Sequence, residues 1–288
     1  MLRLSLLLCL LTQADVRIEP PQLRFEAPAG LASARTRLES FDTKQLADVV
    51  RLVGLRAPGA PISVQLATES SEWAKRVSPW VAGFALAGSD TVVIFPSRSP
   101  SYPDRTLDDV LRHEVAHVLI SRASSRRPVP RWFNEGLAMS AEREWKFRDK
   151  TQLFFELVSG SRESLSTLDQ LFQGTQRDQT RAYLLSGAFV GGLLNENGET
   201  AAGRILQGVA DGNSFESAFA DVIGRSTAAA ESDFWKSQRV WTSWIPVLFS
   251  QEVLWMAVTV LALLAIYRRR RRSAAIRKRW DEEDGPDP

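Results

Sequence analysis

The two histidines of this chain, His113 and His117, lie four residues apart in the run His-Glu-Val-Ala-His, with Glu114 directly after the first. On a helix, residues at this spacing share one face, so both imidazoles can reach a single metal ion while Glu114 lies beside it. Imidazole nitrogens are common ligands of zinc. The spacing therefore predicts a zinc site with an adjacent carboxylate that can act as a base. The alternative is a pair of ordinary surface or core histidines.

Local sequence signals favour one bounded helix for this motif. The run Thr106-Leu107-Asp108-Asp109 is typical of a capping box, and apolar residues follow it at helical spacing. Ser and Pro are frequent in the preceding segment 97–105, and Ser, Arg and Pro are frequent in segment 121–130. Such residues form loops. We therefore expect the motif on a single helix between two loops.

A zinc ion that keeps one position open needs a third protein ligand. The chain has no further histidine, and its single cysteine is Cys9, so a carboxylate must supply the ligand. Glu135 is the candidate, in the run Pro-Arg-Trp-Phe-Asn-Glu-Gly-Leu-Ala over 130–138, on an expected second helix. The alternative is that Glu135 is a solvated surface residue.

The HExxH run followed by an Asn-Glu-Gly-Leu-Ala segment resembles the gluzincin branch of the zinc metallopeptidases, and most closely its peptidase MA-like families. The resemblance covers about residues 35–240, although only the two motifs are specific. It implies one Zn²⁺ ion per chain, held by His113, His117 and Glu135. It also implies that Glu114 is the general base.

Two further positions, 134 and 139, bear on how the imidazoles are oriented. Asn134 resembles a residue that orients the metal ligands without binding the metal itself. It equally fits the role of a residue that caps its own helix. Some gluzincins carry an Asp four residues after the glutamate ligand to orient a histidine, and this chain has Met139 there. We therefore expect another carboxylate or a backbone carbonyl to select the imidazole tautomers.

The expected chemistry is hydrolysis of a peptide or amide bond. Zinc lowers the pKa of a bound water to about 7, and Glu114 can take its proton as the water attacks a carbonyl. The developing oxyanion needs a hydrogen-bond donor, which in related enzymes is often a Tyr or His on a later helix. With no histidine left, Tyr183 is the catalytic candidate. Its alternative is a core tyrosine with its hydroxyl at the edge.

Residues 1–14 have the three regions of a secretory signal peptide: Arg3, the apolar stretch 4–11, and Thr12-Gln13-Ala14 before the expected cleavage. Cys9 lies inside this signal, so the mature chain should contain neither a thiol nor a disulfide. A lipoprotein would be acylated on Cys9, but Leu8 stands where a small residue is expected.

Near the other end, residues 253–267 are apolar apart from Thr259, and Arg268 to Arg272 follow without a break. This resembles a membrane span with a basic stop. We expect the span and its outer flank at 244–267, an extracytoplasmic catalytic domain at 15–243, and a cytoplasmic tail at 268–288. The chain would then be a single-pass protein of the cell membrane. The alternative is a helix that lies in the membrane interface or is buried in the domain.

The basic character of the chain belongs to its membrane flank. The tail after residue 267 carries eight basic and five acidic residues, and Arg3 adds one positive charge, which leaves residues 4–267 at −2 within the overall +2. A nucleic-acid partner is therefore not expected. Lipid phosphates are the expected partners of Arg268 to Arg272, and the oligomeric state is not indicated.

The pattern of elements predicts an α+β fold: a small N-terminal mixed sheet over the HExxH helix, a mainly helical C-terminal lobe, and one transmembrane helix. A short strand region is expected at 15–20 and 22–26, a strand at 61–67, and a hairpin at 81–87 and 91–95. Helices are expected over most of 33–55 and at 165–172, 179–195, 199–209, 214–223 and 226–241. The Gly191-Gly192 pair is expected to mark close helix packing.

These patterns and the resemblance together predict a membrane-anchored, extracytoplasmic zinc-dependent peptidase that acts on a peptide or protein. In gluzincin-like enzymes a hairpin strand at this position pairs with extended substrate, although an ordinary hairpin is the alternative. Two other function classes remain open: a zinc-dependent hydrolase of a non-peptide amide, and a catalytically silent, membrane-tethered binding scaffold. The presence of Glu114 argues against silence, because zinc binding alone does not require it.

Overall fold

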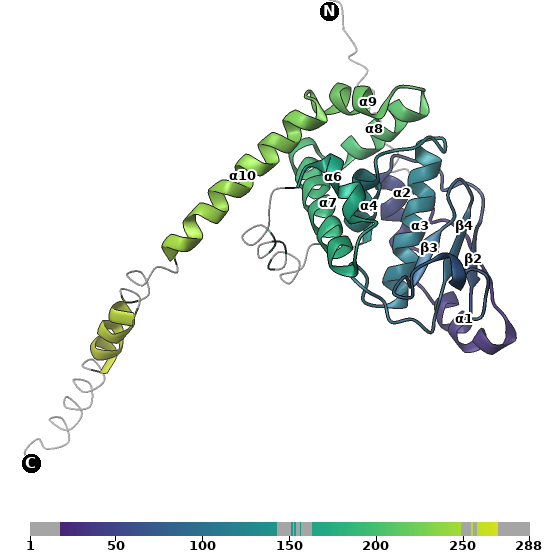
Figure 1. Cartoon of the computed structure of the whole chain (residues 1–288), viewed down its shortest axis with the longest axis horizontal. Helices are drawn as coiled ribbons and strands as arrows, with labels where there is room; N and C mark the ends of the chain where they lie inside the picture. The colour runs from purple at the N-terminus through teal and green to yellow at the C-terminus, as the bar shows by residue number, and fades with distance from the viewer. Residues whose placement is uncertain are drawn as a thin grey trace, which may run out of the picture. The chain divides into compact units, whose positions relative to one another are not determined.

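The structure is a computed structural model that describes residues 18–142, 163–248 and 258–269, together with Thr151, Leu153, Glu156 and Trp255. The chain divides into two compact units, Met1–Phe234 and Trp235–Pro288. The first unit contains the strands and the predicted site (Figure 1). The predicted signal peptide, residues 1–14, lies outside the described residues.

A four-stranded mixed sheet forms one part of the first unit. Its strands are β1 (Leu23–Glu26), β2 (Ile62–Leu66), β3 (Gly83–Ala85) and β4 (Thr91–Ile94), in the spatial order β1-β2-β4-β3. β1 pairs parallel with β2 and β2 parallel with β4, whereas β3 pairs antiparallel with β4. The predicted hairpin is therefore confirmed, and β3 is an edge strand.

The register of the hairpin gives the sheet two distinct faces. Gly83 is opposite Ile94 and Ala85 is opposite Val92, and these residues share one face because side chains alternate along a strand. This face packs on the helix that carries the histidines. Phe84, opposite Val93, belongs to the other face, which is covered by the segment around the short helix η2 (Ala74–Arg76).

Two helices precede β2: α1 (Ala32–Glu39) and α2 (Gln45–Leu52), so the predicted helical region 33–55 is interrupted by a turn. The motif helix is α3 (Leu107–Ala123), which contacts β3 and β4 and also packs on α4 (Arg131–Glu142). α4 in turn packs on α7, as Figure 1 shows. The sheet thus packs on α3, α3 packs on α4, and α4 packs on α7.

The helices of the second half agree with the predicted ranges to within three residues, except that α10 ends at Leu248, seven residues beyond its predicted end at 241. These helices are α6 (Leu165–Leu171), α7 (Gln176–Asn197), α8 (Thr200–Ala210), α9 (Phe215–Ile223) and α10 (Thr227–Leu248). Thr175 and Asp178 form a capping box at the start of α7, three residues before the predicted start.

Close helix packing occurs at a glycine other than the predicted pair. A Cβ atom added to Gly136 on α4 would collide with the Ser186 carbonyl oxygen and lie 2.6 Å from Val190 Cγ2, both on α7. A Cβ atom at Gly192 would meet nothing within 4 Å. The prediction that the Gly191-Gly192 pair marks close packing was therefore wrong at Gly192, because α4 approaches α7 at Ser186 and Val190 instead.

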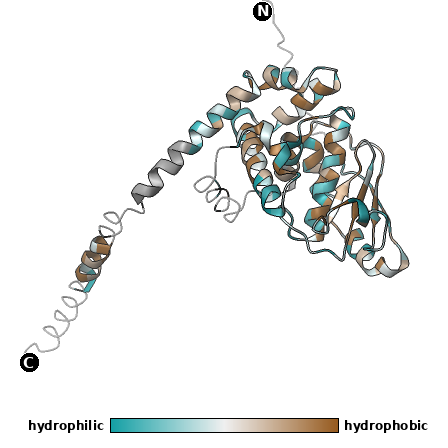
Figure 2. Cartoon of the chain, in the orientation of Figure 1, coloured by the Kyte–Doolittle hydropathy of each residue, from teal (hydrophilic) through white to brown (hydrophobic). Residues whose placement is uncertain are grey.

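Residues 258–269 are helical, and their large apolar side chains are exposed, among them Leu261 and Leu263. Figure 2 shows this helix as mostly hydrophobic with hydrophilic residues at its carboxyl end. Among the residues that the structure describes, no helix combines the length and the apolarity needed to cross a membrane. The predicted span at 244–267 lies partly outside the described residues, so it stays a prediction.

Candidate metal centre and active-site cleft

The helix α3 begins at a well-defined cap, which sets the direction of both histidines. The Asp109 backbone N–H donates to Thr106 Oγ1 at 3.2 Å, and the Asp109 carboxylate accepts from the Thr106 backbone N–H at 3.0 Å. This is the predicted capping box. One helical turn separates His113 from His117, and His113 is only 3% exposed. The two imidazoles therefore leave α3 on the same buried face.

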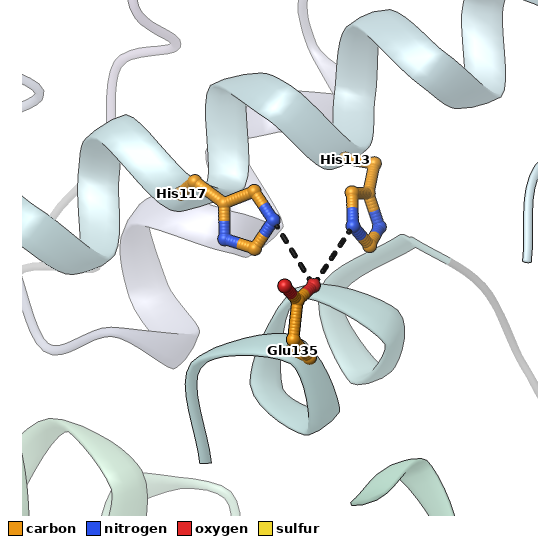
Figure 3. Close-up of side chains that lie close together, drawn as sticks. All are labelled: His113, His117 and Glu135. Carbon is orange, nitrogen blue, oxygen red and sulfur yellow. Dashed lines mark ion pairs between the residues drawn. The ribbon is translucent and has the colours of Figure 1, made fainter. Parts of the chain in front are cut away.

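Helix α4 brings Glu135 to these imidazoles. Glu135 Oε2 lies 3.5 Å from His113 Nε2 and 3.3 Å from His117 Nε2. The possible ligand atoms of the three residues all lie within 4.8 Å of one another. Figure 3 shows the side chains converging from two helices. The structure thus brings together the three residues that the sequence predicts as ligands.

The donor set fits a zinc ion. Tetrahedral zinc with bonds of about 2.0–2.1 Å to nitrogen places its ligand atoms about 3.3 Å apart. The separations from Glu135 Oε2 to the two imidazole nitrogens are close to this value. Glu135 Oε2 is also buried and accepts no hydrogen bond from the described residues. A buried carboxylate oxygen of this kind is stabilised by a cation.

Asn134 orients one of the imidazoles. Its side-chain Oδ1 lies 2.9 Å from His117 Nδ1. An amide oxygen can only accept, so Nδ1–H donates, and the lone pair of Nε2 is left for a metal. The partner of His117 is therefore a side-chain amide, and the expectation of a carboxylate or a backbone carbonyl was wrong for this ring. Met139, which stands where some gluzincins carry an Asp that orients a histidine, is buried at 5% exposure.

The charges of the ligands depend on one another. Burial disfavours the charged form of His117, but the Glu135 carboxylate outweighs burial and raises the pKa of His117. Burial likewise acts to raise the pKa of Glu135, and here the two imidazoles outweigh it and hold that pKa well below its ordinary range. Glu135 is thus a carboxylate across the physiological pH range. Its other oxygen, Oε1, lies 3.5 Å from Arg131 Nε.

Glu114 lies between α3 and the edge strand. It is 7% exposed, and the edge strand approaches it closely because Gly83 has no side chain: a Cβ atom there would lie 3.3 Å from Glu114 Cγ and 2.5 Å from Val110 Cγ1. Burial raises the pKa of the Glu114 carboxyl, although the two imidazoles and the Ala85 backbone N–H act in the opposite direction. Sequence reasoning missed Gly83, for which the only signal was its place in the hairpin.

Tyr183 lies on α7 at the same site. Its ring centroid is 6.2 Å from that of His113 and 5.2 Å from that of Phe172, both in edge-to-face geometry. Burial, followed by the negative charges of Glu135 and Glu114, raises the pKa of the Tyr183 phenol well above its ordinary value. Tyr183 is therefore a neutral phenol at neutral pH and able to donate a hydrogen bond.

These residues share one cleft with a volume of about 690 Å³. The edge strand β3 and the turn that follows it, up to Ser89, line one side. Helix α3 and the loop 124–129 line another, and Gln179 and Tyr183 of α7 complete the described wall. The predicted metal ligands, Glu114 and Tyr183 all lie in this lining.

The comparison with protein families agrees with this geometry. The family model of the Peptidase MA superfamily matches residues 44–240, which is more than half of the chain and includes the sheet from β2 on, α3, α4 and α7. The chain belongs to the Peptidase MA superfamily, whose members have a zinc peptidase-like fold. Among curated proteins, none matches the chain.

Proposed function

We propose that this chain is a zinc-dependent peptidase that hydrolyses peptide bonds in the cleft between β3 and α3. The observation that carries the proposal is the convergence of His113, His117 and Glu135 within 4.8 Å, with Glu114 buried beside them. A metal-binding scaffold would need the three ligands but not a buried carboxylate next to them. Membership of the Peptidase MA superfamily supports the same reaction class.

In this proposal His113, His117 and Glu135 hold one Zn²⁺ ion. Zinc in such a site supplies a Lewis acid that polarises a carbonyl and makes water more acidic. Glu114 accepts a proton from the attacking water and passes it to the departing amine nitrogen. Because Glu114 lines the cleft and is only 7% exposed, it is shielded from bulk solvent while it holds this proton.

Tyr183 is the proposed donor to the oxygen of the scissile carbonyl. Its ring lies against His113, so its side chain belongs to the same site, and its phenol keeps its proton because its pKa is raised. A neutral hydrogen-bond donor that faces the developing oxyanion stabilises the transition state more than the substrate. The role of Tyr183 is therefore electrostatic, and it transfers no proton in the proposed reaction.

The substrate is proposed to be an extended peptide. β3 is an edge strand, and its residues from Gly83 to Ala85 line the cleft next to Glu114. An edge strand has unpaired backbone N–H and C=O groups that can pair with an added strand. A peptide bound in this way would pass its backbone across the metal centre, with its side chains directed alternately to the two faces of the extended sheet.

Membrane anchoring and an extracytoplasmic site are also part of the proposal. Their support is the apolar run 253–267 with Arg268 to Arg272 behind it, the exposed apolar side chains of the helical residues 258–267, and the signal-like residues 1–14. Arg268 to Arg272 would contact lipid phosphates on the cytoplasmic side. Protease treatment of intact cells or spheroplasts tests this topology, because it should degrade the catalytic domain and leave a tag at residue 288 protected.

The test of the central proposal measures zinc content and peptide cleavage together, in the full chain and in three variants. Glu114→Gln should keep one zinc per chain and lose cleavage of a broad peptide pool. Glu135→Ala should lose zinc and cleavage together. Glu26→Gln, an exposed glutamate of β1, is the matched control and should change neither. Cleavage that survives in Glu114→Gln would rule out the proposed base, and absence of zinc from the wild type would rule out the metal site.

A further inference from the structure

Three arginines lie along the cleft on the side of the loop that joins α3 to α4. Arg126 and Arg127 come from this loop, and Arg131 is the first residue of α4. All three side chains are exposed, and all three line the cleft. Neither the hydrolytic reaction nor zinc binding explains why Arg126 and Arg127 are there.

Their charges are compensated to different degrees. Arg131 Nε lies 3.5 Å from Glu135 Oε1. Arg126 shares a single carboxylate, Asp90, with Arg122: the distances to Asp90 are 3.5 Å from Arg126 Nη2 and 3.0 Å from Arg122 Nε. Two guanidinium groups therefore face one carboxylate, which leaves about one positive charge beside Asp90 without a compensating negative charge.

Arg127 has no side-chain hydrogen bond or ion pair within the described ranges 18–142 and 163–248. Its guanidinium lies beside the turn between α8 and α9, where a Cβ atom at Gly212 would be 3.7 Å from Arg127 Nη2. As far as the described residues go, the positive end of the cleft thus holds one arginine without a side-chain partner and one that shares its partner.

The described acidic residues of the cleft lining do not offset this charge. They are Glu114 and Glu135, and both belong to the metal centre, where a Zn²⁺ ion would balance them. With zinc bound, the part of the lining that the structure describes is positive at its loop end. A ligand that places negative charge there is attracted, and one that places positive charge there is repelled.

The distance from this positive end to Glu114 follows from the helix. Glu114 lies beside Gly83 at the start of β3, whereas Arg126 lies beside Asp90 at the far end of the hairpin turn. From Glu114 to the end of α3 at Ala123 the helix rises by about 14 Å, at about 1.5 Å per residue. An extended peptide covers this distance in about four residues.

We infer that the cleft selects peptide segments with acidic side chains about four residues from the bond at the metal centre, and that Arg126 and Arg127 determine this selectivity. The cleavage part of this inference rests on the proposed function, but the binding part does not. An aspartate or glutamate can accept two parallel hydrogen bonds from one guanidinium, which makes arginine well suited to carboxylate recognition. Because both arginines are exposed, each contact should change affinity by a small factor and weaken with salt.

The test is a binding measurement on the zinc-loaded full chain that carries Glu114→Gln, so that bound peptide is not consumed. The probes are fluorescent peptides of alanine and leucine with a run of glutamates at either the amino or the carboxyl end. The matched probes have glutamine in place of glutamate. Fluorescence anisotropy at low ionic strength should show that one glutamate peptide binds about five- to tenfold more tightly than its glutamine counterpart.

Variants assign the preference to the two arginines. Arg126→Gln combined with Arg127→Gln should remove the preference and leave the affinity for the glutamine peptides unchanged. Arg24→Gln, an exposed arginine on β1 at the opposite edge of the sheet, should retain it. Equal binding of glutamate and glutamine peptides, or a preference that survives in the double variant, would overturn the inference.

The same peptides separate this inference from the proposed function. If the wild-type chain binds the glutamate peptide preferentially but cleaves none of the peptides, the peptidase proposal fails and the acidic preference stands. If it cleaves all of them at equal kcat/KM and binds them equally, the peptidase proposal stands and the inference about Arg126 and Arg127 fails.

Discussion

His117 and Glu135 each use their two polar atoms for different partners. His117 turns Nε2 toward Glu135 and Nδ1 toward Asn134, and Glu135 turns Oε2 toward the imidazoles and Oε1 toward Arg131. This arrangement orients the ring and the carboxylate before a metal binds. We therefore expect a residue outside the proposed ligand set, Asn134, to contribute to metal affinity.

Substitution of Asn134 tests this orientation. Asn134→Ala removes the acceptor for His117 Nδ1–H, and we expect zinc affinity to fall by about 10- to 100-fold. Asn134→Asp keeps an acceptor oxygen and should bind zinc nearly as well as the wild type. A competition titration against a zinc chelator measures both. An unchanged affinity in Asn134→Ala would mean that the ring is held by its packing alone.

Substitution of Tyr183 tests the oxyanion donor. Tyr183→Phe keeps the ring contacts with His113 and Phe172 and removes only the hydroxyl. We expect kcat to fall by about 10²- to 10³-fold, with KM and zinc content nearly unchanged, since a donor of this kind acts in the transition state. Tyr267→Phe, outside the cleft, is the control. Full activity in Tyr183→Phe would remove this residue from the mechanism.

At the scale of elements, two glycines set how closely the site's helices and strand approach. Gly83 lets β3 lie directly against α3 beside Glu114, and Gly136 lets α4 pack against α7. Gly136 follows Glu135 immediately, so the contact that places α4 also places this proposed third ligand. Tyr183 lies on α7, so this contact also places Tyr183 relative to Glu135.

The pair Gly136 and Gly192 allows a matched test of this packing. Gly136→Ala brings a Cβ atom to 2.6 Å from Val190 Cγ2 and into the Ser186 backbone, and we expect a loss of stability of about 1–3 kcal/mol. Gly192→Ala adds the same methyl group to open space inside α7 and should stabilise by about 0.5–1 kcal/mol. Thermal unfolding of both variants measures the difference. Similar Tm values would contradict the packing argument.

At the scale of the whole molecule, Arg98 ties the segment before β3 to the rest of the first unit. Its guanidinium donates to the carbonyl oxygens of Ser78 and Val81 at 3.1 and 2.8 Å and forms an ion pair with Glu69 at 2.8 Å. It also lies over the Phe95 ring at 3.9 Å from the centroid. The Arg98 side chain is 7% exposed, so these contacts hold one wall of the cleft in place.

This ion pair should make stability depend on pH. The hydrogen bond from Arg98 is the main cause that lowers the pKa of Glu69 below its ordinary value. A lowered pKa means stability that is present above the unfolded-state pKa and is lost as the pH falls through the folded-state value. Glu69→Gln should therefore lower Tm at pH 7 and make little difference near pH 2. An equal effect at both pH values would contradict this assignment.

Removal of the metal tests whether the proposed metal centre links α3 to α4 and thereby stabilises the first unit. A zinc ion that binds only the folded protein stabilises it by about 2.7 kcal/mol at a free concentration 100 times Kd. We expect a chelator to lower Tm and added Zn²⁺ to restore it, and we expect neither effect in Glu135→Ala. Differential scanning calorimetry of the full chain provides the measurement. A Tm that does not respond to the chelator would argue against a site shared by α3 and α4.

The sequence by itself determined the local features. The spacing of His113 and His117, the capping box at Thr106 and the periodicity of the helices depend on residues within one or two turns of each other. The hairpin around Gly88 is equally local. The chemistry of zinc then required a carboxylate, and Glu135 was found from its motif. For these reasons the mixed α+β class, the order of the elements and the convergence of the three candidate ligands could be predicted.

Only the tertiary structure decided which side chains meet across elements. The contact between Asn134 and His117, the glycine at the crossing of α4 and α7, and the sharing of Asp90 by two arginines join residues far apart in the chain. Periodicity predicts which face of a helix is buried, but not where along that face another helix crosses. The predicted packing at Gly192 was wrong for this reason, since the crossing point depends on the fit of side chains between helices.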